Sequence, residues 1–199
     1  MNLRLGKQEN LPDDVHTVGA EWSECGRYRY ALWRIWGEPG EAAAAFIGMN
    51  PSSADEHHDD ATARKCGQYA RRWGYAGMLM LNLWAIRGTD PEEALRGDVD
   101  PVGPENNGWI VAYAEDGCLT YPDEAMATPV GEHPIGLFVA AWGTRGTMND
   151  RGEHVAKRIA HWQDIYCLGT TKHGHPKHPA RLANDKEPVL YRNKAEGAA

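Results

Sequence analysis

The chain has 199 residues, which is enough for one domain with a complete hydrophobic core. Hydrophobic residues make up 42% and charged residues 25% of the sequence, and these ordinary globular values exclude a disordered or fibrous architecture. The formal net charge of -7 disfavours a protein that coats nucleic acid through a basic surface, but it leaves room for a local basic groove.

The sequence carries no sign of membrane attachment or export. No run approaches the roughly 18 apolar residues that a membrane span needs, and residues 1–14 are too polar for a signal peptide. The four cysteines contain no C-x-x-C pair, which argues against a zinc ribbon or a disulfide-stapled fold. We therefore expect a cytoplasmic protein with no membrane partner and no cofactor.

The first half of the chain predicts strands that alternate with helices. Residues 27–36 alternate apolar with charged side chains and precede a turn, which indicates a hairpin strand. Residues 42–48 form an apolar run that ends in glycine, typical of a strand buried on both faces, although four alanines also allow a short helix. A helix follows, capped by Asp60 or Thr62 and lasting to Trp73.

The middle of the chain continues this alternation. Residues 78–84 predict a second buried strand, and Asp90 followed by proline predicts the start of a short helix. Asn106 or Asn107 is expected to cap another helix that reaches Ala114.

The last third adds two strands and a helix. Apolar runs at 135–142 and 165–169 predict buried strands, and residues 150–162 have the periodicity of an amphipathic helix between them. Strands joined through helices imply a mostly parallel sheet covered on both faces. We therefore expect one α/β domain over 1–199, a three-layer α/β/α fold with a central, mostly parallel four-stranded sheet.

Within this domain, residues 27–188 are expected to form the core, 1–26 an N-terminal extension and 189–199 a C-terminal tail. Ligands of open parallel sheets bind beyond the carboxyl ends of the strands. The polar loops that follow the four predicted strands should therefore converge on one site.

The first of these loops runs from Gly48 to Ser52. Glycine allows the backbone to approach a ligand closely, and Pro51 stiffens the turn that presents Asn50. An asparagine side chain can orient a water molecule or bind a base edge. Asn-Pro-Ser is also a common turn, so spacing alone does not assign a function.

Asn82 interrupts the apolar strand 78–84. A buried amide without a hydrogen bond is unfavourable by about 1–3 kcal/mol, so this side chain needs a partner. The partner is either a neighbouring backbone group or a ligand at the end of the strand.

Histidines and basic residues gather in two further segments. His175 and His178 lie on a proline-stiffened loop and suit proton transfer or the stabilisation of an anion. A basic groove for DNA or a nucleotide is expected from two groups of residues: Arg64, Lys65, Arg71 and Arg72, and Lys172, His173, His175, Lys177, His178 and Arg181. Solvated surface residues would show the same pattern.

Six motifs in order resemble the family known as domain of unknown function 1643, which occurs in bacteria and phages. They are Met49 to Ser52, Asp59 to Thr62, Arg71 to Tyr75, Asn82 to Trp84, Pro101 to Asn106 and Leu168 to Lys172. The resemblance covers roughly residues 27–188 and implies no reaction.

A more distant resemblance is to the uracil-DNA glycosylase superfamily. The sequence Gly48-Met49-Asn50-Pro51 is similar to its first motif, Trp142-Gly143 to the end of its third strand, and His178-Pro179-Ala180-Arg181 to its histidine loop. This resemblance implies that Asn50 positions the attacking water, Asn82 reads the base and His178 stabilises the departing base anion. It also implies that Arg181 or Leu182 enters the duplex while the target base is flipped into the pocket.

The chain departs from that pattern at some positions. Ser52 stands where the superfamily has glycine and Ala180 where it has serine, and Tyr69, Trp73 or Trp84 would replace a stacking phenylalanine. The catalytic residues implied are Asn50 and His178. The residues expected to bind substrate are Gly48, Met49, Pro51, Ser52, Asp60, Thr62, Asn82, Trp84, Arg87, Trp142, Lys172, His175 and Arg181.

The leading hypothesis is an enzyme of glycosylase-like fold that cleaves or exchanges an N-glycosidic bond in DNA or a nucleotide. Its target is an ordinary or a modified base. One alternative is a non-catalytic module that binds a nucleotide, nucleic acid or protein in the same pocket. Another is a metal-dependent hydrolase that binds its metal through His175 and His178 together with His57, His58, Asp59 and Asp60.

Overall fold

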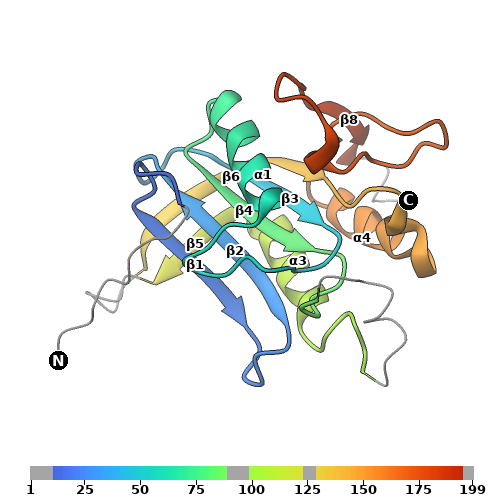
Figure 1. The fold of residues 1–199 in the computed structure, drawn as a ribbon, viewed down its shortest axis with the longest axis horizontal. Helices are drawn as coiled ribbons and strands as arrows, with labels where there is room; N and C mark the ends of the chain where they lie inside the picture. The colour runs from blue at the N-terminus through green and yellow to red at the C-terminus, as the bar shows by residue number, and fades with distance from the viewer. Residues whose placement is uncertain (1–10, 89–98, 123–128, 195–199) are drawn as a thin grey trace.

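The computed structural model describes residues 11–88, 99–122 and 129–194 (Figure 1). The strands are β1 (Thr17–Trp22), β2 (Arg29–Ile35), β3 (Ala43–Gly48), β4 (Gly77–Asn82), β5 (Cys118–Pro122), β6 (Pro129–Ala140), β7 (Ile165–Cys167) and β8 (Val189–Arg192). The helices are α1 (Ala61–Arg72), α3 (Asn106–Asp116) and α4 (Arg151–Ala160), with 3-10 turns η1 (Thr144–Asp150) and η2 (Pro179–Arg181).

The strands form one mixed sheet in the order β1-β2-β4-β3-β6-β7-β8, with β5 paired to β6. The four strands predicted from apolar runs are present as β3, β4, β6 and β7, and they pair in parallel. The prediction of an α/β protein is confirmed, and β3 is a strand rather than the short helix that its alanines allowed.

The expectation of a mostly parallel four-stranded sheet is wrong. Among the described residues the sheet has eight strands, and four of its seven pairings are antiparallel. The expected N-terminal extension contains β1, and the expected tail contains β8, each paired to a neighbouring strand. Antiparallel partners need no crossover helix, so the alternation of strands and helices does not reveal them.

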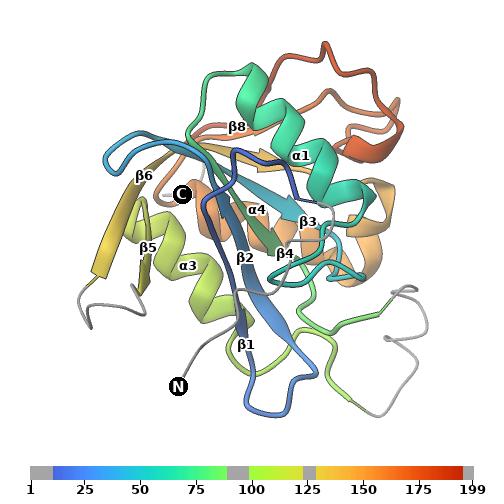
Figure 2. The same ribbon diagram turned by 60° about the vertical axis from the view of Figure 1, so that its left-hand side comes forward.

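Helices cover both faces of the sheet, as Figure 2 shows. On one face, Cys66, Tyr69 and Ala70 of α1 pack against β3 and β4. On the other face, α3 and α4 pack against the same strands through side chains such as Ile110 and Ile159. The two large apolar clusters of the described residues therefore lie on opposite faces of the sheet, which is the predicted three-layer arrangement.

The hairpin strand predicted at 27–36 is present as β2, which pairs antiparallel with β1. All seven residues of β2 are buried, including Arg29 and Arg34. The strand lies between β1 and β4, and its two arginines donate hydrogen bonds to carbonyls of Ala54 and Asp55 in the loop between β3 and α1. This loop therefore covers side chains that would otherwise face water.

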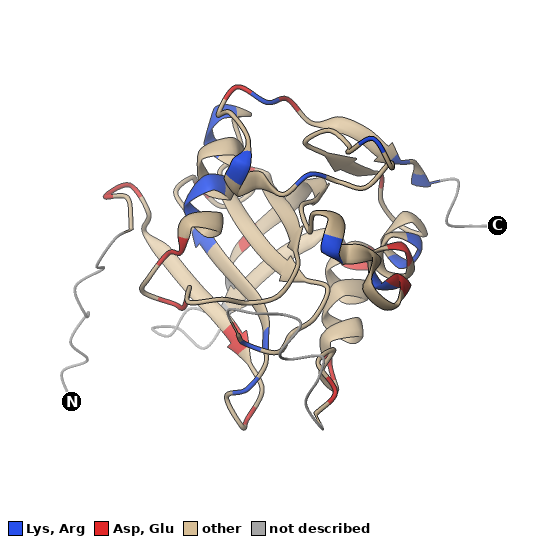
Figure 3. Cartoon of the chain, turned by 45° about the vertical axis from the view of Figure 1, so that its right-hand side comes forward, with Lys and Arg blue, Asp and Glu red and all other residues tan. Residues whose placement is uncertain are grey.

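The N-terminus of α1 was predicted correctly. Asp60 is the N-cap, and its Oδ1 accepts a hydrogen bond of 2.8 Å from the backbone N–H of Ala63. Lysine and arginine residues occur along this helix, as the blue segments of Figure 3 show.

The start of α3 was predicted wrongly. Its N-cap is Glu105, and the Nδ2 of Asn106 instead donates to the carbonyls of Asn82 and Leu83 at 3.1 Å each. Those carbonyls belong to the last residue of β4 and to the residue after it, so Asn106 fixes the exit of that strand. The short helix expected at Asp90 lies outside the described residues.

No helix formed by the described residues has both the length and the apolar character to cross a bilayer.

Candidate functional site

A cavity of about 210 Å³ lies at the carboxyl ends of β3 and β4. Gly48 ends β3, Asn82 ends β4, and the two are direct partners in the parallel pairing. The lining residues are Arg29, Gly48, Met49, Asn50, Ser52, Ala54, Asp60, Thr62, Ala63, Met80, Asn82, Gly88 and His178. The cavity thus brings together Asn50, Asn82 and His178 from three separate segments of the chain.

Asn82 presents an unused hydrogen-bond donor to this cavity. The residue is 1% exposed, and its Nδ2 has no hydrogen-bond partner among the described residues. Its Oδ1 lies so close to Gly48 that a Cβ there would be 2.9 Å away, so glycine is what leaves room for this amide. Because a buried donor needs a partner, the side chain is suited to bind a ligand acceptor.

Asn50 is held in one orientation by the chain around it. Its Nδ2 donates to the carbonyl of Gly88 at 2.7 Å and to that of Pro51 at 3.2 Å. The N–H of Gly88 donates in turn to the same Pro51 carbonyl at 2.9 Å. Since both donors of the Asn50 amide point to backbone carbonyls, its Oδ1 is the atom that remains to accept a hydrogen bond.

His178 enters the site from the loop after β7. The backbone N–H of Ala180 donates to its Nδ1 at 3.3 Å, which places the proton of the neutral ring on Nε2. Burial lowers the pKa of His178, the charge of Arg181 lowers it further, and Asp60 opposes both effects. At neutral pH the ring is therefore uncharged and offers an N–H donor.

Arg29 lines the cavity and was not predicted as a site residue. It is 2% exposed, and its Nη1 donates to the carbonyl of Ala54 at 2.7 Å, while its Nε has no partner among the described residues. Burial lowers its pKa to about 10, and Asp60 is the strongest opposing charge. The guanidinium therefore stays charged at neutral pH. The alternating pattern of this strand carries no sign of a cavity, which depends on the loop through Ala54 that lies over Arg29.

Seven of the predicted substrate-binding residues do not line the cavity. They are Pro51, Trp84, Arg87, Trp142, Lys172, His175 and Arg181. Trp84 and Trp142 are buried in the core on the face that α3 and α4 cover, and glycines at 146 and 152 make room for Trp142.

The other five have different environments outside the cavity lining. Arg87 is exposed, donates to the carbonyl of Ser52 at 3.2 Å and packs over the Trp22 ring. Lys172 and Arg181 are exposed, and His175 is half-buried. Pro51 is buried behind Asn50 and contributes its carbonyl.

The aromatic residues considered for base stacking also lie elsewhere. Tyr69 and Trp73 stack on one another in the core beneath α1, and Phe46 stacks on Trp73. No tryptophan, tyrosine or phenylalanine is among the described residues that line the cavity. Its apolar walls come from Met49 and Met80 instead.

The residues considered for a metal site have separate partners. Asp59 pairs with Arg34, Asp60 caps α1, and His58 bonds to Asp55 at 3.0 Å. Among the described residues, no three His, Cys, Asp or Glu side chains are placed to hold a metal ion. The arrangement therefore gives no support to the metal-dependent hydrolase hypothesis.

The basic residues of α1 are engaged within the protein. Arg71 pairs with Asp14 at 2.7 Å, Arg72 with Glu187 at 3.0 Å, and Lys65 binds Asn184. The contacts of Lys65 and Arg72 dock the segment after η2 along the helix, and that segment begins just beyond His178. The helix cations thus help to position the histidine loop.

The comparisons with known proteins give a family and no reaction. No curated protein and no solved structure matches the chain. A family model described as protein of unknown function (DUF1643) matches residues 29–180, which include every described residue that lines the cavity. This match covers most of the sequence, and the chain therefore belongs to the DUF1643 family.

Proposed function

We propose that this protein is a nucleobase-processing enzyme that cleaves or exchanges the N-glycosidic bond of a nucleotide or of a base in DNA. The observation that supports it most is the shared cavity of Asn50, Asn82 and His178. These residues are far apart in sequence, and their side chains supply the acceptor and donors that such a reaction needs.

The size of the cavity fits a compact ligand. Pockets for drug-sized molecules measure about 300–1,000 Å³, whereas this one measures about 210 Å³. One nucleobase with part of its sugar is a suitable occupant. A flipped base would reach such a pocket from single-stranded DNA, or from a duplex after unpairing.

Each of the three side chains has a role in the proposed reaction. The unpartnered Nδ2 of Asn82 donates to a carbonyl of the base. The Oδ1 of Asn50 accepts a hydrogen bond from the water that attacks the sugar. The Nε2–H of His178 donates to the departing base, where negative charge collects as the bond breaks.

Arg29 extends this set of donors. Its buried guanidinium places a fixed positive charge in the wall of the cavity. A cation shielded from water interacts strongly with an anion because the local dielectric is low. We propose that Arg29 favours a base that leaves as an anion.

A uracil-DNA glycosylase-like arrangement of the central strands is part of the proposal. It is supported by the four parallel strands β4, β3, β6 and β7 and by the position of the cavity at their carboxyl ends. The antiparallel strands β1, β2, β5 and β8 would then be additions to that core.

The second candidate is a non-catalytic module that binds a nucleotide, nucleic acid or protein. It is favoured by the lack of a tryptophan, tyrosine or phenylalanine among the described lining residues, because base-binding sites commonly stack the base on such a ring. In this case the same cavity would bind its ligand without turnover.

The test is release of free base, measured by chromatography and mass spectrometry. The substrates are single-stranded and duplex oligonucleotides that contain uracil, hypoxanthine or 5-hydroxymethyluracil, together with the corresponding free nucleotides. We expect release by the wild-type protein and none by Asn50→Ala, while Arg87→Ala, outside the cavity, stays active. If every substrate in the panel stays intact, the proposal of an enzyme is refuted. Tight binding of a substrate without release of its base would support the non-catalytic binding module.

A further inference from the structure

Asp60 is the one carboxylate among the described residues that line the cavity. Its Oδ1 accepts the N–H of Ala63, and its Oδ2 has no hydrogen bond to a described residue. Two buried donors without described partners share this cavity, the Nδ2 of Asn82 and the Nε of Arg29. A carboxylate with one free oxygen therefore lies in a pocket that already has unused groups for a ligand.

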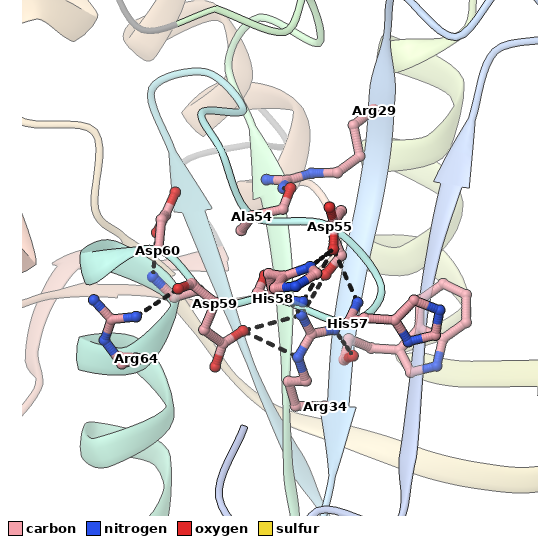
Figure 4. Close-up of polar contacts among 11 residues, drawn as sticks. Arg29, Arg34, Ala54, Asp55, His57, His58, Asp59, Asp60 and Arg64 are labelled. Carbon is pink, nitrogen blue, oxygen red and sulfur yellow. Dashed lines mark hydrogen bonds and ion pairs between the residues drawn. The ribbon is translucent and has the colours of Figure 1, made fainter. Parts of the chain in front are cut away.

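The electrostatic effect of Asp60 on its neighbours is consistent with its position in the cavity wall. Asp60 acts on the pKa of both Arg29 and His178, which line the cavity with it. Figure 4 shows Arg29 reaching in from β2 and Asp60 at the start of α1, with the loop through Ala54 between these elements. The carboxylate thus lies within electrostatic reach of the groups proposed to bind and release the base.

Hydrolysis of a glycosidic bond needs a group that accepts a proton from water. Asn50 can orient the water through its Oδ1, but an amide does not take up a proton near neutral pH. His178 is assigned to the departing base, and its Nδ1 already accepts the N–H of Ala180. Asp60 is the remaining proton acceptor among the described lining residues.

We infer that Asp60 is the general base that deprotonates the attacking water, a role that rests on the proposed glycosidic cleavage. The water oxygen bonds to the anomeric carbon of the sugar while the bond from that carbon to the base nitrogen breaks. The bonding electron pair leaves with the base, whose negative charge the Nε2–H of His178 stabilises. The proton of the water moves to the Oδ2 of Asp60 and then to solvent.

The helix-capping role of Asp60 allows a clean separation of structure from chemistry. Asparagine and serine cap helices about as well as aspartate. Asp60→Asn and Asp60→Ser therefore keep the N-cap of α1 and remove only the proton acceptor. Asp14→Asn is the matched control, because it alters an exposed carboxylate whose partner is Arg71.

The experiment measures single-turnover base release from the best oligonucleotide of the panel and the urea unfolding midpoint of each variant. We expect Asp60→Asn and Asp60→Ser to release base about 10²–10⁴-fold more slowly, with midpoints close to that of the wild type. Asp14→Asn should keep the wild-type rate. Added formate should partly restore the Asp60→Ser rate, because a small carboxylate can occupy the vacated space.

Three outcomes separate this inference from the proposed function. A wild-type protein that releases no base overturns both. If the wild-type protein releases base and Asp60→Asn releases it equally fast, only the assignment of Asp60 as general base is overturned. A sugar adduct on wild-type Asp60, detected as a mass increase that Asp60→Ser lacks, also overturns it, because Asp60 would then be the nucleophile.

Discussion

Arg29 and Arg34 lie on the same strand, are buried to the same degree and differ in how their hydrogen bonds are satisfied. Arg34 donates from Nε to Asp59 at 3.0 Å, from Nη1 to the carbonyl of Trp33 at 2.8 Å and from Nη2 to the carbonyl of Asp55 (Figure 4). Arg29 donates only to Ala54 among the described residues, and its Nε is unpartnered.

The two arginines therefore have different roles, one in the structure and one at the cavity. The guanidinium of Arg34 is surrounded by acceptors and holds the loop before α1 against the sheet. That of Arg29 borders the cavity with a donor unused. Buried polar groups in folded proteins are nearly always hydrogen-bonded, so the unsatisfied arginine is the one that indicates a ligand.

Replacing Arg34 should have the largest effect on stability. Arg34→Met leaves Asp59 buried without its cation, and removing one partner of a buried pair costs about 3–5 kcal/mol in unfolding free energy. Urea denaturation measures this loss. Arg71→Met, which breaks an exposed pair with Asp14, should cost under about 1 kcal/mol. Equal losses in the two variants would contradict a structural role for Arg34.

Replacing Arg29 should affect function more than stability. Arg29→Met removes one hydrogen bond to the Ala54 carbonyl, which should cost about 1–3 kcal/mol. Base release should fall about 10²-fold or more, because the charge that favours the departing anion is gone. The fall should be smaller for 5-fluorouracil than for uracil, since the more acidic base leaves with less assistance. An equal fall for both bases would argue against that role.

Asn82 offers a finer test of the same contrast. Asn82→Leu removes an amide whose nitrogen has no described partner, so the unfolding free energy should change by under about 1 kcal/mol. Base release should nevertheless be lost. Thermal and urea unfolding check the first expectation. A destabilisation as large as that of Arg34→Met would show that the amide is satisfied in the folded protein.

The contribution of His178 to the pH dependence of stability should be the smallest of these effects. Its pKa in the folded protein is lowered, so the unfolded chain binds more protons as the pH falls through the usual value near 6.5. Stability should therefore decrease from pH 7.5 to pH 5.5, and Arg181 and Asp60 are the charges that modulate this change.

His178→Gln isolates this contribution from the other histidines. The decrease in unfolding free energy over the same pH range should be smaller in the variant than in the wild type. An identical pH dependence would show that His178 is not held in its neutral form.

The sequence predicted the central part of the fold well. Runs such as 42–48 and 78–84 are apolar throughout because parallel strands are covered on both faces, and this pattern is visible without a structure. Asp60 was one of the two caps expected for α1, with Thr62, because helix N-termini need a side-chain acceptor. The antiparallel strands at both ends of the sheet were missed because short strands joined without helices leave weaker signals.

The candidate site was predicted in part. Gly48, Asn50 and Asn82 stand at strand ends, where the rule for parallel sheets predicts a binding site, and all three line the cavity. Trp84 and Trp142 also stand near strand ends, but their side chains point into the core of the opposite layer. The direction of a side chain after a strand depends on the path of the loop, which the spacing does not specify.

The sequence by itself determined the parallel centre of the sheet, the beginning of α1 near Asp60 and Thr62, and the loop that presents Asn50, because each depends on local pattern and short-range hydrogen bonds. Only the tertiary structure decided that Arg29 is buried and that Asp60 and His178 share its cavity. Those facts depend on a covering loop and on the docking of a distant segment along α1. Contacts between remote segments create the charged part of this pocket, and no periodicity in the sequence records them.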